Sequence, residues 1–381
     1  MRVVKKVLVI GNASSIWIKE YIHNIHFKCN NTVYVTAYDP LSKEYLREYG
    51  DMNVSVVNLF GRNKAIDKLT KAAKLILFCF KNRNNIDCID IQSPPHSFQA
   101  RLLSFLISAM GKKVVVTFWG SDLLRIDSKK AMKIEPIIKK ADIINLPSDD
   151  LKEKFEYYFH GRYLCKETTA CFGSPAFQYI KEIKDHGEKN QCKKWLGAEE
   201  DTITVAIGYN GSDAQQHLKI ICSLKKQAEK FKDRITILIH LGYGFSEDYV
   251  EQIEEMLSDG CMKYILLKEM MPLEDVAKLR SATDIMIHGQ TTDALSGYIR
   301  EAVFAGAVLI NPEWIKYREF ERLGIEYIEY SSFDELSDVL EKIINKEIVI
   351  NTEKNAELMF SEYSWDSVYE DWMRIFNERT D

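Results

Sequence analysis

Short apolar runs recur along the chain in two consecutive series, and this repetition limits the available folds more than any other feature. The first series comprises residues 7–10, 32–36, 54–57, 88–92, 114–118 and 143–146. The second comprises residues 203–208, 235–240, 264–267, 285–288 and 308–310. Segments of helical spacing separate the runs, which predicts parallel sheets covered by helices on both faces. We therefore expect an α/β protein with two doubly wound domains in tandem.

A chain of 381 residues suits two domains of ordinary size. We place the first domain at residues 1–195 and the second at 196–355. The polar stretch 181–201, rich in Lys and Glu, lies between the two series and is predicted to be a linker. The tail combines helical spacing with large aromatic residues, so we predict a C-terminal helix over 356–381 that packs back on the first domain.

Composition excludes several classes of protein. The chain carries 51 basic and 56 acidic residues, a net charge of −5 that argues against a general nucleic-acid binder. Its eight cysteines form no C-x-x-C pair, so a zinc site is not expected and a reducing compartment is favoured. The start of the chain has no signal-peptide pattern, and no uncharged apolar stretch reaches eighteen residues. These features predict a cytoplasmic protein.

Glycine-rich and polar segments follow two strands of the second series. Gly208, Gly211 and Ser212 follow the first strand, and a helix is predicted to begin near Leu295 or Ser296 after a later one. Backbone N–H groups in such turns and at helix starts can bind a phosphate. The segment 284–312 could equally be an ordinary packing unit whose acids are solvated, and the residues alone leave both interpretations open.

The order of the motifs resembles one known family. In segment 284–312, Asp293 and Glu301 are separated by seven residues, and Ala302, Gly306 and 308–310 follow. This pattern is similar to the E-x(7)-E donor-binding segment of GT-B glycosyltransferases, especially family 4, and segments 141–148, 238–244 and 273–279 resemble further motifs of that family in its order. The resemblance implies two Rossmann-like domains facing a cleft, with Asp293 contacting the donor sugar and Glu301 holding the ribose.

The chain departs from family 4 at two places. The Arg and Lys that usually neutralise the diphosphate are absent from 208–217, where His217 could lend a charge near neutral pH. This region resembles the bacterial 4-acetamido-fucose lipid II transferases, which are also GT-B proteins. The donor-binding residues that we expect are Gly11, Gly208, Asn210, Gly211, Ser212, His217, His240, Gly242, His288, Ser296, Gly297 and Glu301.

The second departure concerns the catalytic base. Trp119 stands where many retaining GT-B enzymes have a histidine. Asp122, just after a predicted strand, is our candidate base for an acceptor hydroxyl, although Asp at this position could equally cap the next helix. His96 is the alternative base, and a histidine after Pro-Pro is more often structural. Asp293 is the third catalytic candidate.

The resemblance implies transfer of a sugar from a UDP- or dTDP-sugar to a glycan or polyprenyl-diphosphate-linked acceptor in bacterial surface polysaccharide synthesis. It implies no metal, other cofactor or nucleic-acid partner. A catalytically silent GT-B subunit that assists another transferase, and a GT-B sugar-nucleotide epimerase, remain alternatives.

A basic segment bears on the location of the protein. Residues 62–83 contain seven basic residues and one acid, and Lys64, Lys68, Lys71 and Lys74 lie on or near one helical face. Such a helix favours an anionic membrane surface, here the inner face of the plasma membrane, but it could also be a solvated helix packed on the sheet.

Overall fold

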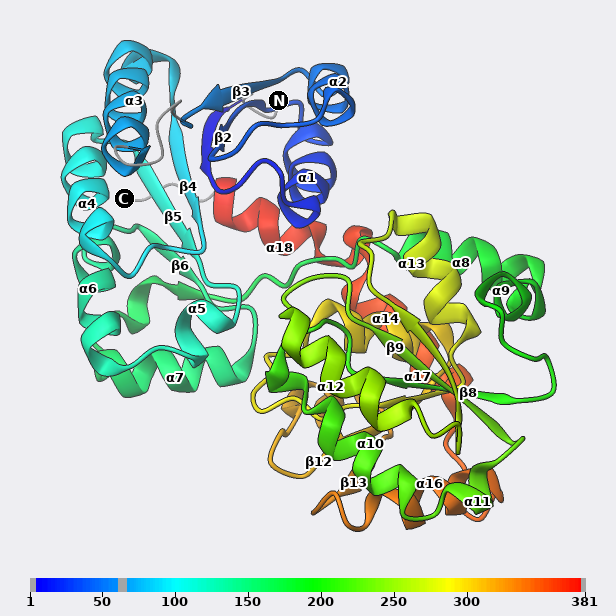
Figure 1. Ribbon diagram of the computed structural model, residues 1–381. Helices are drawn as coiled ribbons and strands as arrows, with labels where there is room; N and C mark the ends of the chain where they lie inside the picture. Colours follow the sequence, from blue (N-terminus) through cyan, green and yellow to red (C-terminus); the bar gives the residue numbers. More distant parts are fainter. Residues whose placement is uncertain (1–4, 61–66, 378–381) are drawn as a thin grey trace. The chain divides into compact units, whose positions relative to one another are not determined.

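The computed structural model describes residues 5–60 and 67–377 (Figure 1). The chain divides into two compact units. The first unit contains the chain up to Gly173 and from Trp365 onward, and the second contains Ser174–Ser364. Each unit has its own sheet and its own core, so the two-domain α/β class predicted from the sequence is confirmed.

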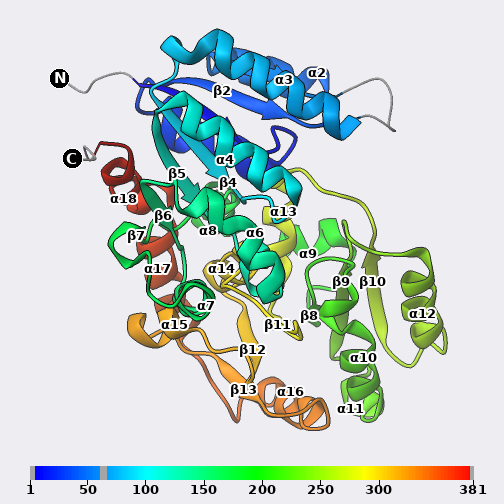
Figure 2. The same ribbon diagram turned by 90° about the vertical axis from the view of Figure 1, so that its left-hand side faces the viewer.

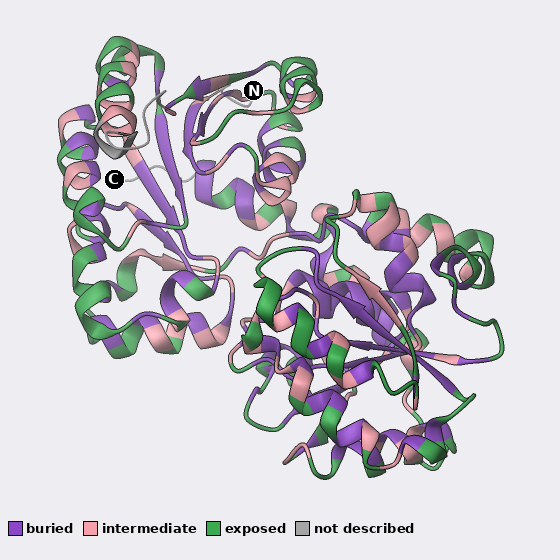
Figure 3. Ribbon diagram, viewed as in Figure 1, coloured by how far each residue is buried: buried purple, intermediate pink, exposed green. Residues whose placement is uncertain are grey.

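The first unit is built on a seven-stranded parallel sheet with the order β3-β2-β1-β4-β5-β6-β7. Its strands are β1 (Lys6–Ile10), β2 (Thr32–Ala37), β3 (Val54–Asn58), β4 (Cys88–Gln92), β5 (Lys113–Thr117), β6 (Ile143–Asn145) and β7 (Glu167–Thr168). The central strands are buried along almost their whole length (Figure 3), as expected for a sheet with helices on both faces. The two-residue strand β7 has no apolar run and was not predicted.

Helices cover both faces of this sheet. One face carries α3 (Asp67–Asn82), α4 (Phe98–Met110) and α6 (Ser128–Ile138), which lie side by side (Figure 2). The other carries α1 (Ile16–Tyr21), the π-helix Ile22–Phe27 and α18 (Trp365–Asn377), whose Trp372 is fully buried in the core. The remaining α-helices described in this unit are α2 (Lys43–Asp51), α5 (Ser121–Leu124) and α7 (Asp149–Phe159).

The second unit has a six-stranded parallel sheet with the order β10-β9-β8-β11-β12-β13. Its strands are β8 (Ile203–Ile207), β9 (Ile235–His240), β10 (Lys263–Leu267), β11 (Ile285–Ile287), β12 (Val308–Pro312) and β13 (Ile328–Tyr330). Its helices are α8 (Phe177–His186), α9 (Lys189–Leu196), α10 (His217–Lys225), α11 (Ala228–Phe231), α12 (Glu247–Leu257), α13 (Leu273–Ala282), α14 (Gly297–Ala305), α15 (Arg318–Leu323), α16 (Leu336–Ile344) and α17 (Thr352–Tyr363).

The stretch 181–201 is mostly helical, which corrects the prediction of a linker. Helices α8 and α9 pack against α13 and belong to the second unit, so the boundary lies after Gly173 rather than after residue 195. Lys193 on α9 is buried and contacts the Asp284 carboxylate at 2.6 Å. The many Lys and Glu residues suggested a solvent-exposed linker, but some of these charges are paired inside the unit, so the stretch folds into α8 and α9.

The tail consists of two helices instead of the single one predicted over 356–381. Ser364 adopts an extended conformation that ends α17, which packs on α14 in the second unit. Helix α18 then joins the first unit, where the Trp372 indole donates to the Cys171 carbonyl at 2.7 Å.

No helix in the described residues is long and apolar enough to span a lipid bilayer.

Candidate functional site

The strand order of the second unit reverses at β8, which has β9 on one side and β11 on the other. Ligands of doubly wound sheets bind beyond the carboxyl ends of the strands at such a point. The loops that follow β8 and β11 are bonded together here. The Thr291 amide donates to the Ala214 carbonyl at 3.1 Å, and the Gln216 side chain donates to the Gly289 carbonyl at 2.7 Å. The sequence-predicted glycine loop and the segment before Glu301 therefore meet at one edge.

The loop after β8 requires its glycines. Gly208 has a φ of +63°, and a Cβ there would lie 2.2 Å from Nε2 of His217. A Cβ on Gly211 would lie 2.3 Å from the Cβ of Phe245. Asn210 Oδ1 accepts from the Ser212 amide at 2.9 Å, which closes the turn. The His217 and Phe245 side chains therefore pack directly against this loop, and larger residues at these two glycines would displace it.

Three buried histidines surround this edge of the sheet. Burial lowers the pKa of His217 and of His240 to about 4, and it also lowers the pKa of His288. These imidazoles are therefore neutral at pH 7, and the expectation that His217 supplies a charge is wrong. Within the described residues, Nε2 of His217 and Nε2 of His288 have no hydrogen-bond partner. Gly242 has a φ of +39° and lies against the His240 ring.

Asp293 is fixed by three donors. The Tyr317 hydroxyl donates to Oδ2 at 2.8 Å, the Tyr209 hydroxyl donates to Oδ1 at 3.2 Å, and the Ser296 amide donates to Oδ2 at 2.9 Å. The Tyr317 hydroxyl also lies 3.3 Å from Nδ1 of His288. The carboxylate is thus held in one orientation just before α14 begins.

Glu301 lies one turn into α14 and is buried with two partners. The Ser174 hydroxyl donates to Oε1 at 2.7 Å, and Nε of Arg280 donates to Oε2 at 3.2 Å. The Arg280 guanidinium also covers the Tyr298 ring, with its central carbon 3.6 Å from the ring centre. A carboxylate oxygen has two lone pairs, so each oxygen can accept one further hydrogen bond.

A continuous stack of side chains connects the surroundings of the two acids. Tyr209 stacks on Tyr298 at 5.0 Å and on His288 at 6.1 Å, with ring planes within 24°. Arg280 extends the stack beyond Tyr298, and Tyr317 extends it beyond His288 at 6.3 Å. Sequence reasoning missed Tyr209, Tyr298, Tyr317 and Arg280 because none of them belongs to a recognised spacing. The position of Tyr209 between Gly208 and Asn210 was the one available signal.

Helix α14 begins at Gly297 with Ser296 before it, one to two residues after the predicted start near Leu295 or Ser296. The preceding Leu295 has a φ of +55°, so the chain turns sharply into the helix. The first N–H groups of a helix have no partner within it, and they carry a partial positive charge. This helix start follows β11 and the loop after β8 follows β8, so both lie at the carboxyl edge of neighbouring strands; the Gly211 and Ser212 amides of the loop are already bonded within the protein.

The candidates of the first unit have different surroundings. The Gly11 amide donates to the Thr36 hydroxyl at 3.1 Å, and a Cβ on Gly11 would collide with Ile18 at 2.8 Å. His96 is exposed. Asp122 is buried, which raises the pKa of its carboxyl, and its oxygens accept from the amides of Trp119 and Gly120 at 2.8–3.1 Å. Asp122 therefore closes its own turn, whether or not it also serves as a base.

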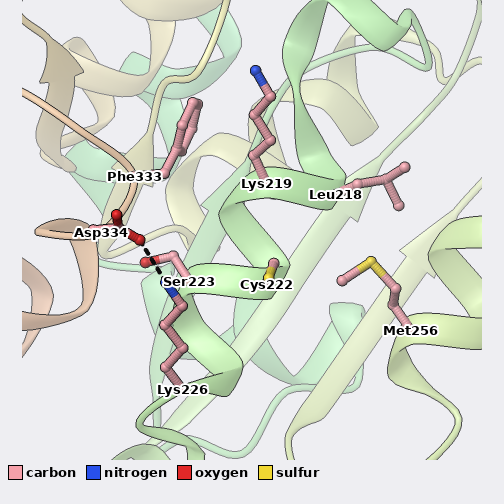
Figure 4. Close-up of a pocket in the computed structure, with 8 residues that line it drawn as sticks. All are labelled: Leu218, Lys219, Cys222, Ser223, Lys226, Met256, Phe333 and Asp334. Atoms are coloured by element: carbon pink, nitrogen blue, oxygen red, sulfur yellow. Dashed lines mark hydrogen bonds and ion pairs between the residues drawn. The ribbon is translucent and has the colours of Figure 1, made fainter.

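A separate open groove of about 320 Å³ lies along α10 (Figure 4). Its wall includes Leu218, Met256 and Phe333, and an ion pair of 2.5 Å joins Lys226 to Asp334 at one end. None of the residues predicted to bind the donor lines this groove. It is therefore distinct from the site at the β8–β11 edge.

Comparison with known proteins gives a likeness in structure alone. No family model matches the chain, and no curated protein matches it in sequence. A solved glycosyltransferase from Rickettsia africae covers 99% of this chain and 100% of its own, with a TM-score of 0.77 and 12% identity. The similarity to HepE from Anabaena, solved with UDP-glucose, covers 98% of this chain and 99% of HepE, with a TM-score of 0.70 and 11% identity.

The chain has the GT-B fold. A UDP-GlcNAc 2-epimerase from Neisseria meningitidis, solved with UDP-GlcNAc, is similar over 98% of both chains, with a TM-score of 0.63 and 14% identity. Proteins of more than one activity therefore share this architecture. The GT-B fold expected from the resemblance is confirmed, and the choice among activities depends on the site.

Proposed function

We propose that the protein is a glycosyltransferase whose nucleotide-sugar donor binds at the carboxyl edge of the second sheet. The observation that carries this proposal is the convergence of the loop after β8, the start of α14 and two oriented carboxylates, Asp293 and Glu301. Backbone donors suit a diphosphate, and carboxylates suit sugar hydroxyls. The glycosyltransferases of the same fold, one of them solved with UDP-glucose, support the assignment.

Each part of the donor has a proposed partner. The diphosphate lies against the loop 208–212 and the start of α14 at Gly297. The Gly211 and Ser212 amides already donate to the Tyr243 carbonyl and to Asn210 Oδ1, so the first amides of α14 are the main backbone donors to phosphate. Neutral His217 and His240 can each add one N–H donor there in place of a cation, whereas neutral His288 uses its N–H on Asn311 Oδ1 at 2.9 Å. Glu301 accepts hydrogen bonds from the ribose, and Asp293 accepts one from the transferred sugar. Because Asp293 is shorter than the usual Glu and already holds two tyrosine hydroxyls, the sugar must approach it closely.

The acceptor is proposed to be a glycan or a polyprenyl-diphosphate-linked sugar in the synthesis of a bacterial surface polysaccharide. Its hydroxyl attacks the anomeric carbon of the donor sugar, and the nucleoside diphosphate leaves with the electrons of the broken bond. Asp122 is the proposed base for the hydroxyl proton, since its raised pKa favours proton uptake. His96 is the alternative.

Epimerisation of a nucleotide sugar is the second candidate. Two UDP-GlcNAc 2-epimerases, from Neisseria meningitidis and Listeria monocytogenes, share the fold with TM-scores of 0.63 and 0.61. An epimerase would convert the sugar nucleotide without an acceptor. A silent partner subunit would bind nucleotide weakly or fail to consume it.

The deciding experiment is calorimetry with UDP, dTDP, GDP and their common sugars, followed by incubation of the bound donor with and without acceptor. We expect one nucleoside diphosphate to bind, and its sugar to be transferred in the presence of EDTA, because we propose a metal-independent reaction. Acceptor-independent conversion would favour the epimerase, and no binding of any nucleotide by folded protein would refute the site.

A further inference from the structure

Large apolar side chains are exposed on one face of the first unit. Phe98 and Phe105 on α4 are 68% and 70% exposed, and Leu77 and Phe80 on the neighbouring α3 are 70% and 50% exposed. Met132 on α6 is 41% exposed. The three helices lie side by side over the same face of the sheet (Figure 2). We call this surface the α3–α4–α6 face.

The exposed residues form stripes rather than isolated points. On α4, Phe98, Arg101 and Phe105 are spaced by three and four residues, so they lie along one side of the helix. Its opposite side packs on the sheet through buried Leu103, Leu106, Ile107 and Met110. On α3, Lys74, Leu77 and Lys81 have the same spacing and are all exposed. Helix α4 therefore presents a second apolar side away from the core, while α3 exposes Leu77 between two lysines.

The charges around these stripes are almost all positive. The helices α3, α4 and α6 contain eight basic residues and two acids, within a chain of net charge −5. One acid is Asp67, whose side chain lies outside the described part. The other is Glu135, which is bound by Arg162 and lies 3.7 Å from Lys139. Lys74, Lys81 and Arg101 are exposed on the same two helices as the exposed apolar side chains, and the exposed Asp127 caps α6.

We propose that the α3–α4–α6 face docks on an anionic lipid bilayer. Phenyl and aliphatic side chains can enter the boundary between headgroups and acyl chains, while Lys and Arg contact lipid phosphates. A soluble polyanion would use the cations but leave Phe98 and Phe105 exposed to water. The apolar stripe therefore favours a bilayer over a nucleic acid or another soluble polyanion.

The structure also shifts the membrane contact predicted from residues 62–83. Lys64 lies outside the described residues, and the side chain of Lys68 is also outside them. Lys71 is half-buried, with its ammonium 6.0 Å from the Tyr38 ring centre. The exposed anchors are instead on the C-terminal half of α3 and on α4. This surface does not depend on the donor site, so the proposal stands apart from the proposed function.

The test is co-sedimentation of the full chain with vesicles of phosphatidylcholine, with and without about 30% phosphatidylglycerol, at low and high salt. The wild-type protein should bind the anionic vesicles, and high salt should weaken the binding. The pair Phe98→Ser with Phe105→Ser should weaken it at least tenfold. Arg101→Glu, a single exposed change, should weaken it at least about fivefold.

Met270→Ser and Lys354→Glu in the second unit are the matched controls, since Met270 is 72% exposed and Lys354 is exposed. These should bind vesicles like the wild type. Circular dichroism checks the folding of each variant. If the double phenylalanine variant does not fold, the result for Arg101→Glu is the deciding one. Equal binding to neutral vesicles, equal loss in the controls, or binding to heparin but not to vesicles would overturn the proposal.

Discussion

Removal of the Arg280 charge should destabilise the second unit strongly. Arg280 and Glu301 have side chains 6% and 5% exposed, with Nε and Oε2 3.2 Å apart. Arg280→Met keeps the apolar stem but leaves the Glu301 carboxylate buried with the Ser174 hydroxyl. Breaking a buried pair on one side costs about 3–5 kcal/mol of unfolding free energy. Glu301→Met should cost a similar amount, because it leaves the guanidinium buried.

The double variant Arg280→Met with Glu301→Met separates pairing from general damage. Two apolar residues of similar volume often replace a buried ion pair at little cost, so the double variant should be more stable than either single one. We expect a coupling energy of at least about 2 kcal/mol, well above the deviation found for independent sites. The measurement is urea unfolding of the full chain at pH 7. Additive losses would refute the pairing.

The same variants test the role of Glu301 in binding. If its carboxylate holds the ribose, the double variant should regain stability but bind the nucleoside diphosphate about 1–3 kcal/mol more weakly. Wild-type affinity in a stable double variant would leave Glu301 a structural role alone. Lys230→Met is the control, since its ion pair with Glu341 is partly exposed and should contribute less than about 1 kcal/mol.

Two further predictions concern the buried histidines and the glycine loop. Because the folded pKa of His217 and of His240 is about 4, below the unfolded value near 6.5, acid favours the unfolded state; stability should fall by roughly 2 kcal/mol for each between pH 7 and pH 5. Urea unfolding at several pH values across this range should show that the unfolding free energy of His217→Gln depends less on pH than that of the wild type. An unchanged pH dependence would contradict the lowered pKa of His217. Gly208→Ala should cost about 1–3 kcal/mol more than Gly111→Ala, because both glycines have a φ near +60° but only the new Cβ at Gly208 meets a side chain within 4 Å, that of His217. Equal losses of stability in Gly208→Ala and Gly111→Ala, measured by thermal unfolding, would mean that the contact with His217 does not contribute to the cost.

The local pattern of the sequence determined most of the strands and their division between two parallel sheets. Runs such as 235–240 are apolar throughout because both faces of a parallel strand are covered, and this signal needs no knowledge of distant residues. The start of α14 at Gly297 and the spacing of Asp293 and Glu301 were also readable, since they depend on a few neighbouring residues. The weakest signals failed: the short strands β7 and β13 have little or no apolar run.

Contacts between distant residues decided the rest. The stretch 181–201 looked like a linker because its lysines and glutamates suggested solvent, yet Lys193 is buried against Asp284. His217 has a pKa of about 4 because the fold buries it under Gly208, which sequence cannot show. Arg280 meets Glu301 across 21 residues, and Tyr317 meets Asp293 across 24. Desolvation and pairing depend on which segments the fold brings together, so the sequence located the acids while the tertiary structure set their partners.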